Sequence, residues 1–135
     1  MKYLLDTNVL CEIVRPQPNP KVRDWLVQNS VSSVVSAISM GEIWKGIESM
    51  PDGKRKVDYQ DWFTHQEAEF QSRILTVDLP VMKQWGSYWA QQKKRGVSLS
   101  ILDSLIASTA KVYQLVLVTR NYSDFPDVSV LNPWD

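Results

Sequence analysis

The chain has 135 residues, of which 44% are hydrophobic and 22% charged, and its 15 basic and 15 acidic residues give a formal net charge of zero. This length and composition predict one globular domain, residues 1–135, and leave no room for a second. A net charge of zero excludes the overall positive field of a non-specific nucleic-acid binder, so any such partner must be held by local contacts. The single cysteine, Cys11, excludes an internal disulfide and is typical of a reducing compartment. Because residues 3–5 already have a strand pattern and no signal peptide precedes them, we expect a cytoplasmic protein.

The first predicted element is a short strand that stops at an acid. Residues 3–5 are apolar, too few to span a membrane, and typical of a strand buried on both faces. Thr7 and Asn8 are residue types that cap helices, and an apolar helical pattern follows at residues 9–14. Ligands of open α/β sheets bind beyond the carboxyl ends of the strands, where Asp6 would lie. Asp6 is therefore a candidate functional residue, with a turn or capping role as the alternative.

Strands and helices then alternate along the chain. Helices are predicted at residues 21–29, 39–49, 54–73, 79–95 and 101–113, and strands at residues 31–36, 74–77, 115–118 and 128–131. The run at 115–118 is apolar without alternation, as expected of a central parallel strand, whereas 128–131 would be an edge strand. This alternation predicts an α/β fold with a mostly parallel central sheet flanked by helices on both faces.

Several polar residues have adequate structural explanations. Ser39 with Glu42, and Ser100 with Asp103, have the spacing of a capping box, so both acids are candidates for stabilising a helix start. Asp124 lies in a loop, where an Asx-turn is the structural alternative.

The helix predicted at residues 79–95 has polar residues at both ends. Asp78 precedes Leu79 and Pro80 and is expected to cap the helix. Lys93 to Gly96 closes it with basic residues and a glycine, for which a phosphate contact is the alternative to local electrostatics.

Four acids follow a strand or begin the next helix, namely Asp6, Glu42, Asp103 and Asp124. A parallel sheet would bring them together at its carboxyl edge. Two carboxylates about 5 Å apart repel by roughly 3 kcal/mol at an effective dielectric of about 20, so such a cluster needs a cation or takes up protons. The lone histidine, His65, lies in a polar segment and is expected to be solvated, and oxygen ligands alone favour magnesium or manganese. Such a site supports phosphodiester cleavage.

Five motifs occur in series: residues 4–10, residues 39–43 with Gly46, residues 103–110, residues 118–125 and residues 131–134. Together they resemble the PIN-domain ribonucleases, and above all the VapC and FitB toxins of bacterial toxin-antitoxin pairs. The resemblance covers nearly the whole chain, in the order and spacing of that family.

The resemblance implies a role for each matching residue. The metal-binding and catalytic acids would be Asp6, Glu42 and Asp103, with Asp124 as a fourth, more variable one, and Asn8, Thr119 and Asn121 would be supporting polar residues. It implies a magnesium- or manganese-dependent endoribonuclease that forms a homodimer and is silenced by an antitoxin inserted into the active-site groove. The basic segments to test for RNA contact are Arg15, Lys45, Lys54–Lys56 and Lys93–Arg95. The segment 54–73 carries no sharp family motif and is a candidate for setting substrate choice.

The main alternative is a non-catalytic RNA- or protein-binding regulatory module of the same fold, in which the acids are caps and the tryptophans form an interaction surface. Two other α/β families fit poorly. A receiver domain requires a paired acid near the first strand and a lysine after the last one, where this chain has Asp6-Thr7-Asn8 and Thr119-Arg120-Asn121. A phosphatase of the haloacid-dehalogenase type requires an acid at Asn8. The sequence does not identify the RNA, the cleavage site, the antitoxin or the number of metal ions.

Overall fold

Five parallel strands form the sheet at the centre of the computed structural model, which describes residues 1–135. The strands are β1 (Tyr3–Leu5), β2 (Ser33–Ser36), β3 (Ile74–Leu75), β4 (Val116–Val118) and β5 (Val130–Leu131). Their order across the sheet is β3-β2-β1-β4-β5, and every neighbouring pair is parallel. The predicted α/β class is confirmed, with β4 inside the sheet and β5 at its edge.

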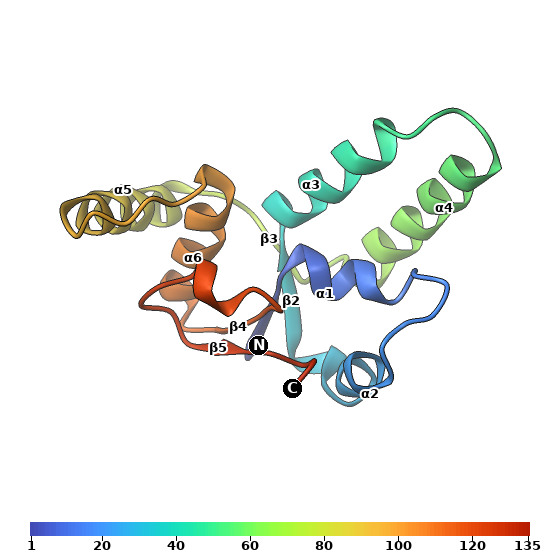
Figure 1. Ribbon diagram of the computed structural model, residues 1–135, viewed down its shortest axis with the longest axis horizontal. Coiled ribbons are helices and arrows are strands. Elements are labelled where there is room, and N and C mark those ends of the chain that lie inside the picture. The colour runs from blue at the N-terminus through green and yellow to red at the C-terminus, as the bar shows by residue number, and fades with distance from the viewer.

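Helices cover both faces of the sheet, as the alternation of elements predicts (Figure 1). In this view α1 (Thr7–Glu12), α2 (Pro20–Asn29), α3 (Ala37–Glu48) and α4 (Lys54–Glu69) lie to the right of the strands, and α5 (Leu79–Lys94) and α6 (Ile101–Tyr113) lie to the left. Two short 3-10 helices, η1 (Ser30–Ser32) and η2 (Tyr122–Asp124), precede β2 and follow β4. None of the helices combines the length and the apolar character needed to cross a lipid bilayer.

The sheet separates two hydrophobic cores. In β1, Leu4 and Leu5 are both fully buried, yet they belong to different cores because successive side chains of a strand point to opposite faces. The core on the Leu5 side includes side chains from α1, α2, α3 and α4, and the core on the Leu4 side includes side chains from α5 and α6. Burial on both faces is the reason that the inner strands show continuous apolar runs.

The start of α3 differs from the sequence prediction. The Oγ of Ser36 accepts a hydrogen bond from the amide of Ile38 at 3.1 Å, so the helix begins at Ala37 rather than near Ser39. Ser39 is fully buried inside α3, and its hydroxyl has no hydrogen-bond partner. The predicted capping box of Ser39 with Glu42 is therefore wrong, which leaves Glu42 without that structural role.

The predicted helix at residues 54–73 is too long by one turn. α4 ends at Glu69, and Arg73 lies beyond it with its guanidinium donating to the carbonyls of Ser30 and Ser33 at 2.6 and 2.7 Å. The backbone carbonyl of Arg73 also accepts from the amide of Val35 at 3.0 Å, which extends the pairing of β2 with β3. These contacts explain why the chain leaves the helix at this point, and η1 explains why β2 begins at Ser33 instead of Val31.

Candidate active site

Asp6 lies at the carboxyl end of β1 and begins α1 as its N-cap residue. Its backbone amide still pairs with the sheet, donating to the carbonyl of Val118 at 2.9 Å. Its Oδ1 accepts from the amide of Thr7 at 2.8 Å, and its Oδ2 accepts from the hydroxyl of Thr119 at 2.8 Å and from the Nδ2 of Asn8 at 3.4 Å. Asp6, rather than Thr7 or Asn8, is thus the helix cap, and both of its carboxylate oxygens are held in place.

Glu42 reaches the same site from the second turn of α3. Its Oε1 accepts a hydrogen bond from the hydroxyl of Thr7 at 3.2 Å. Thr7 therefore orients two acids at once, Asp6 through its backbone amide and Glu42 through its side chain. The sequence analysis assigned no such role to Thr7, although a hydroxyl directly after an acid at a strand end is the signal that indicates it.

Asp103 and Asp124 complete the acidic set. Asp103 lies in the first turn of α6, where its amide donates to the Oγ of Ser100 at 3.0 Å, so the predicted cap by Ser100 is confirmed. Asp124 lies in η2, which follows β4, the strand that pairs directly with β1. The carboxylate of Asp124 is exposed and forms no hydrogen bond that would define an Asx-turn. It is therefore open to a ligand.

The acids raise one another's affinity for protons. Burial is the main reason that the pKa values of Asp6, Glu42 and Asp103 lie above their usual range. Repulsion adds to it, because Asp103 and Asp124 raise the pKa of Asp6, and Asp124 raises that of Asp103. Hydrogen bonds from Thr119 to Asp6 and from Thr7 to Glu42 oppose the shift. None of the four acids forms an ion pair with a lysine or arginine, although Lys45 is near enough to lower the pKa of Glu42.

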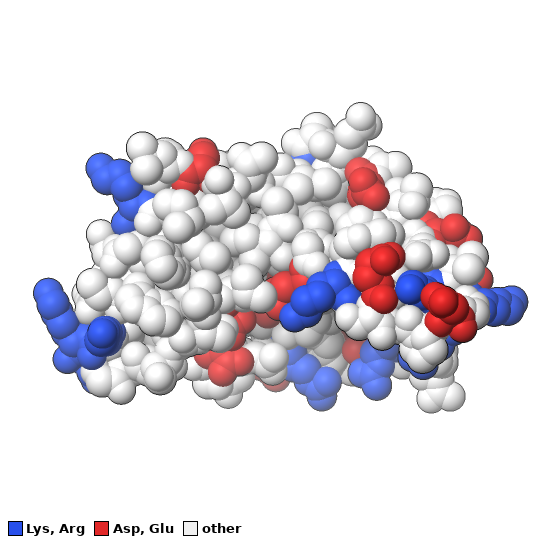
Figure 2. Space-filling view, turned by 90° about the horizontal axis from the view of Figure 1, so that it is seen from above, with Lys and Arg blue, Asp and Glu red and all other residues white.

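Figure 2 shows the molecule from above, along the carboxyl ends of the strands of Figure 1. Acidic side chains gather near the middle of this face, and basic side chains lie directly beside them. A nucleic-acid ligand of a chain with zero net charge requires local positive charges of this kind.

The donor chemistry of this cluster fits a hard divalent cation. All the candidate ligands are carboxylate oxygens, and burial of several repelling carboxylates is the electrostatic condition that a cation relieves. No three acidic, histidine or cysteine side chains lie close enough together in this geometry to hold one ion directly. Magnesium usually keeps several of its waters and is bound through one or two carboxylates, so this spacing suits it better than a cation that needs a closed protein cage.

The supporting polar residues form a network behind Asp6. The buried hydroxyl of Thr119 accepts from the amide of Asn121 at 3.1 Å and from the Nδ2 of Asn8 at 3.4 Å while it donates to Asp6. The Oδ1 of Asn8 accepts from the amide of Arg120 at 3.4 Å. Asn8 and Thr119 therefore contact Asp6 directly, whereas Asn121 joins the network through its backbone amide.

The sequence matches a known protein family over nearly its whole length. The PIN domain family matches residues 3–131, which is nearly the whole chain. The chain belongs to the PIN domain family.

Relatives of this PIN domain align over almost their full length. The toxin FitB of Neisseria gonorrhoeae is 36% identical, over 97% of this chain and 97% of its own. The VapC ribonuclease Y4jK of Sinorhizobium fredii is 29% identical, over 98% of this chain and 97% of its own. The crystal structure of FitAcB from Neisseria gonorrhoeae has a TM-score of 0.91 and 35% identity, and covers 98% of both chains. The resemblance to the PIN-domain toxins VapC and FitB is confirmed.

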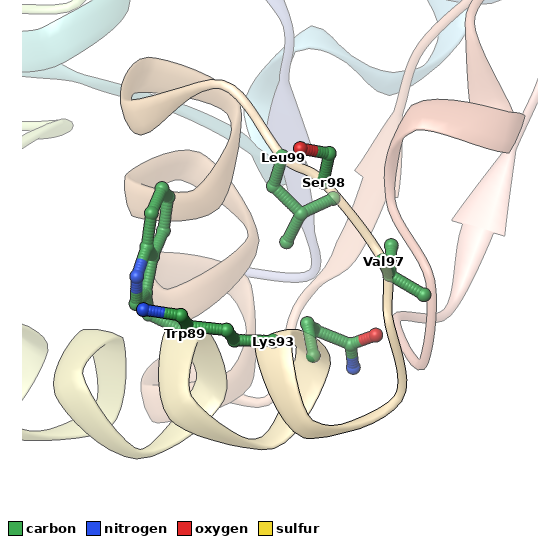
Figure 3. A pocket seen from close by; sticks show the side chains of 6 residues that line it. Trp89, Lys93, Val97, Ser98 and Leu99 are labelled. Atoms are coloured by element: carbon green, nitrogen blue, oxygen red, sulfur yellow. The ribbon is translucent and has the colours of Figure 1, made fainter.

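One cavity of this PIN domain lies away from the acids. It has a volume of about 160 Å³ and lies between the last turns of α5 and the segment 97–99 (Figure 3). Trp89 and Lys93 form one side, and Val97, Ser98 and Leu99 form the other. None of the four acids lines it. The basic segment Lys93–Arg95 therefore lies beside a separate cavity rather than in the candidate active site.

Proposed function

We propose that this PIN domain is a metal-dependent endoribonuclease that acts as the toxin of a toxin-antitoxin pair. The observation that carries the proposal is the group of acids Asp6, Glu42, Asp103 and Asp124 at the carboxyl edge of the sheet, none of them neutralised by an ion pair. Buried charges of one sign are costly unless a cation or protons offset them. The relatives named VapC ribonuclease and toxin FitB give further support.

In this proposal the same four acids form the site of Mg²⁺, or Mn²⁺ in its place, with one or two carboxylates bound directly and the others through waters of the ion. The bound ion would supply an activated water and stabilise the charge that develops on the phosphate. The chain itself orients the ligands: the Thr119 hydroxyl fixes Oδ2 of Asp6, and the Thr7 hydroxyl fixes Oε1 of Glu42. Hydrogen bonds of this kind determine which oxygen faces the ion and favour the charged form of each carboxylate.

The proposed partners are RNA, a cognate antitoxin protein and a second copy of this chain. Large apolar side chains are exposed on α5 and α6, with Leu79 at 70%, Met82 at 39% and Ile101 at 61% of their full exposure. Leu79 and Met82 are three residues apart on α5 and so share a face of that helix, and exposed apolar side chains of this kind support the homodimer. Light scattering of the purified chain is expected to give the mass of a dimer; only monomer at micromolar concentration would contradict it. Cellular RNA as substrate places the proposed activity in the cytoplasm.

The experiment that tests the proposed activity uses purified protein and total cellular RNA, with magnesium, with manganese and with EDTA. We expect discrete fragments that require the metal and that are absent with the folded Asp6→Ala variant. Because Asp6 also caps α1, circular dichroism must first show that the variant retains its helices. Absence of cleavage by the folded, antitoxin-free protein on every RNA fraction would favour the alternative, a non-catalytic RNA- or protein-binding module.

A further inference from the structure

A cleft of about 290 Å³ opens beside the acidic site. Asn8 lines the cleft and also donates to Asp6, so the cleft and the site share one residue. The remaining wall includes Arg15 from the segment after α1, Tyr59 from α4, and Arg120 and Trp134 from the C-terminal part of the chain. Positive and aromatic side chains thus lie next to the carboxylates, and the buried acid Glu12 is also part of the lining.

Two arginines lie over aromatic rings that line this cleft: Arg120 is itself part of the lining, whereas Arg55 lies outside it. The guanidinium carbon of Arg120 is 5.2 Å from the centroid of the Trp134 ring. On the side of α4, the guanidinium carbon of Arg55 is 5.7 Å from the centroid of the Tyr59 ring. Neither arginine forms an ion pair, so both charges are free to meet an anion.

Arg15 differs from these two arginines because a buried acid offsets its charge. Its Nη1 lies 3.1 Å from Oε1 of Glu12, a side chain with only 4% exposure. The other oxygen of Glu12 accepts from the amide of Asn19 at 3.1 Å. Glu12 therefore anchors Arg15 at the edge of the cleft, and the uncompensated positive charge comes from Arg120 and Arg55.

The wall formed by Arg120 and Trp134 is fixed to the catalytic edge of the sheet. The amide of Arg120 donates to Asn8 at 3.4 Å, and its carbonyl accepts from the Nδ2 of Asn132 at 3.5 Å. The Oδ1 of Asn132 accepts in turn from the amide of Trp134 at 2.9 Å. The backbone of this wall is thus held relative to Asp6 before any ligand binds, which lowers the ordering cost of binding.

We propose that this cleft binds a nucleotide of single-stranded RNA next to the phosphodiester bond that is cleaved at the acidic site. Arg120 and Arg55 contact the phosphates, and the base stacks on the guanidinium and aromatic surfaces of the walls. The acids repel RNA, so affinity for a polyanion must come from cations beside them, and free arginines paired with aromatic rings supply both charge and stacking. The aromatic rings in the walls favour RNA over an acidic peptide, because RNA bases can stack on them whereas an acidic peptide would need only the positive charge. This assignment rests on the proposed ribonuclease function.

The test measures binding of a short fluorescein-labelled single-stranded RNA by anisotropy over a series of salt concentrations. The full chain is used with Asp103→Asn to prevent cleavage, and Arg120→Ala is compared with it. We expect the dissociation constant to rise roughly tenfold and the slope of log affinity against log salt to fall by about 0.7, as for one lost contact to single-stranded RNA. Arg120→Lys should restore the slope while regaining only part of the affinity, because a lysine keeps the charge without the planar stacking group.

Two further variants separate a direct contact from a structural effect. Lys83→Ala removes an exposed cation of α5 on the other side of the sheet and should change neither quantity. Trp134→Leu should weaken binding without changing the salt slope. If this variant does not fold, the comparison of Arg120→Ala with Arg120→Lys still tests the subsite. Affinity and slope equal to those of the parent in Arg120→Ala would overturn the subsite and indicate a cleft that contacts protein instead.

Cleavage assays distinguish failure of the subsite from failure of the proposed function. With Asp103 restored, shortening the RNA on one side of the cleavage position should abolish the difference between Arg120→Ala and the unaltered chain. Cleavage that does not depend on Arg120 would reject the subsite but not the proposed ribonuclease function. RNA binding that depends on Arg120, without cleavage under any metal condition, would reject the nuclease and keep the cleft as an RNA-binding site.

Discussion

Asp6 combines a structural role with its proposed chemical role in one side chain. Its Oδ1 caps α1, and its Oδ2 faces the hydroxyl of Thr119 among the other acids. A capping explanation for an acid at a strand end therefore does not argue against a role in the site. Asp103 lies in the first turn of α6, but there the cap is Ser100, so the proposed role of the Asp103 carboxylate is in the site rather than in the helix.

Thr7 is the residue whose role can be tested with the least disturbance. Thr7→Val removes the hydroxyl that donates to Glu42 at 3.2 Å and preserves both the side-chain volume and the amide that donates to Asp6. Loss of a hydrogen bond to a metal ligand typically costs about 10- to 100-fold in metal affinity or activity. We expect a fall of that size in Mn²⁺ affinity, measured by calorimetry. Thr7→Ser keeps the hydroxyl and should bind like the unaltered protein; equal loss in both variants would contradict the role of the hydroxyl.

Asp103→Asn should stabilise the metal-free protein at neutral pH while it abolishes cleavage. Burial raises the pKa of Asp103 in the folded protein above its usual value of 3.8, so the folded state holds the proton more tightly than the unfolded state. The free energy of unfolding is then highest below the unfolded pKa and falls as pH rises through the folded pKa. Asparagine has no such charge to bury.

Urea unfolding in EDTA across a pH series measures this effect. The midpoint of Asp103→Asn should exceed that of the unaltered protein at pH 7, and the two should converge as the pH falls below about 3.8. Asp61→Asn, at an exposed position on α4 where the carboxylate forms no ion pair, is the matched control and should show little change. An Asp103→Asn protein that is less stable at pH 7 in EDTA would show that the carboxylate mainly serves the helix.

Caps determine where the helices begin, and the sequence alone does not always show which residue is the cap. Asp78 and Ser100 were correctly predicted as caps because each directly precedes an apolar helical pattern. The start of α3 was placed too late because Ser36 and Ser39 are equally good cap types, and only tertiary packing decides between them. Ser39 is buried and lies inside the helix. Its burial depends on contacts with residues distant in the sequence, which a local sequence pattern does not show.

Asp78 provides a test of capping that is independent of the site. Its Oδ1 accepts from the amide of Val81 at 3.2 Å at the start of α5. Asp78→Ala should lower the free energy of unfolding by about 1 kcal/mol in urea denaturation, because a helix amide loses its partner. RNA cleavage should be unchanged, since α5 contributes none of the acids. Asp78→Ser should recover most of the stability, and a variant with unaltered stability would show that solvent replaces the cap at no cost.

The whole molecule was more predictable than its local details. Alternating patterns predicted the parallel sheet. The rule that ligands lie beyond the carboxyl ends of strands predicted that Asp6 and Asp124 lie at one edge of it; β1 and β4 are neighbours, and Asp124 is near enough to raise the pKa of Asp6. The pairing of Arg120 with Trp134 was not predicted, because it depends on how the chain returns after β5 rather than on any periodicity. The assignment of all four acids as metal ligands remains a prediction.

That assignment is tested most directly by titration calorimetry of Mn²⁺ into the protein between pH 5 and 7, in two buffers with different ionisation enthalpies. If the acids hold the ion, binding favours their charged forms, and because burial and repulsion raise the pKa values of Asp6, Glu42 and Asp103, proton release on binding should grow as the pH is lowered towards those values. We expect proton release that increases as the pH falls, and binding that is lost in folded Asp6→Asn. Absence of binding at millimolar Mn²⁺, or binding that Asp6→Asn retains, would contradict a metal site at these carboxylates.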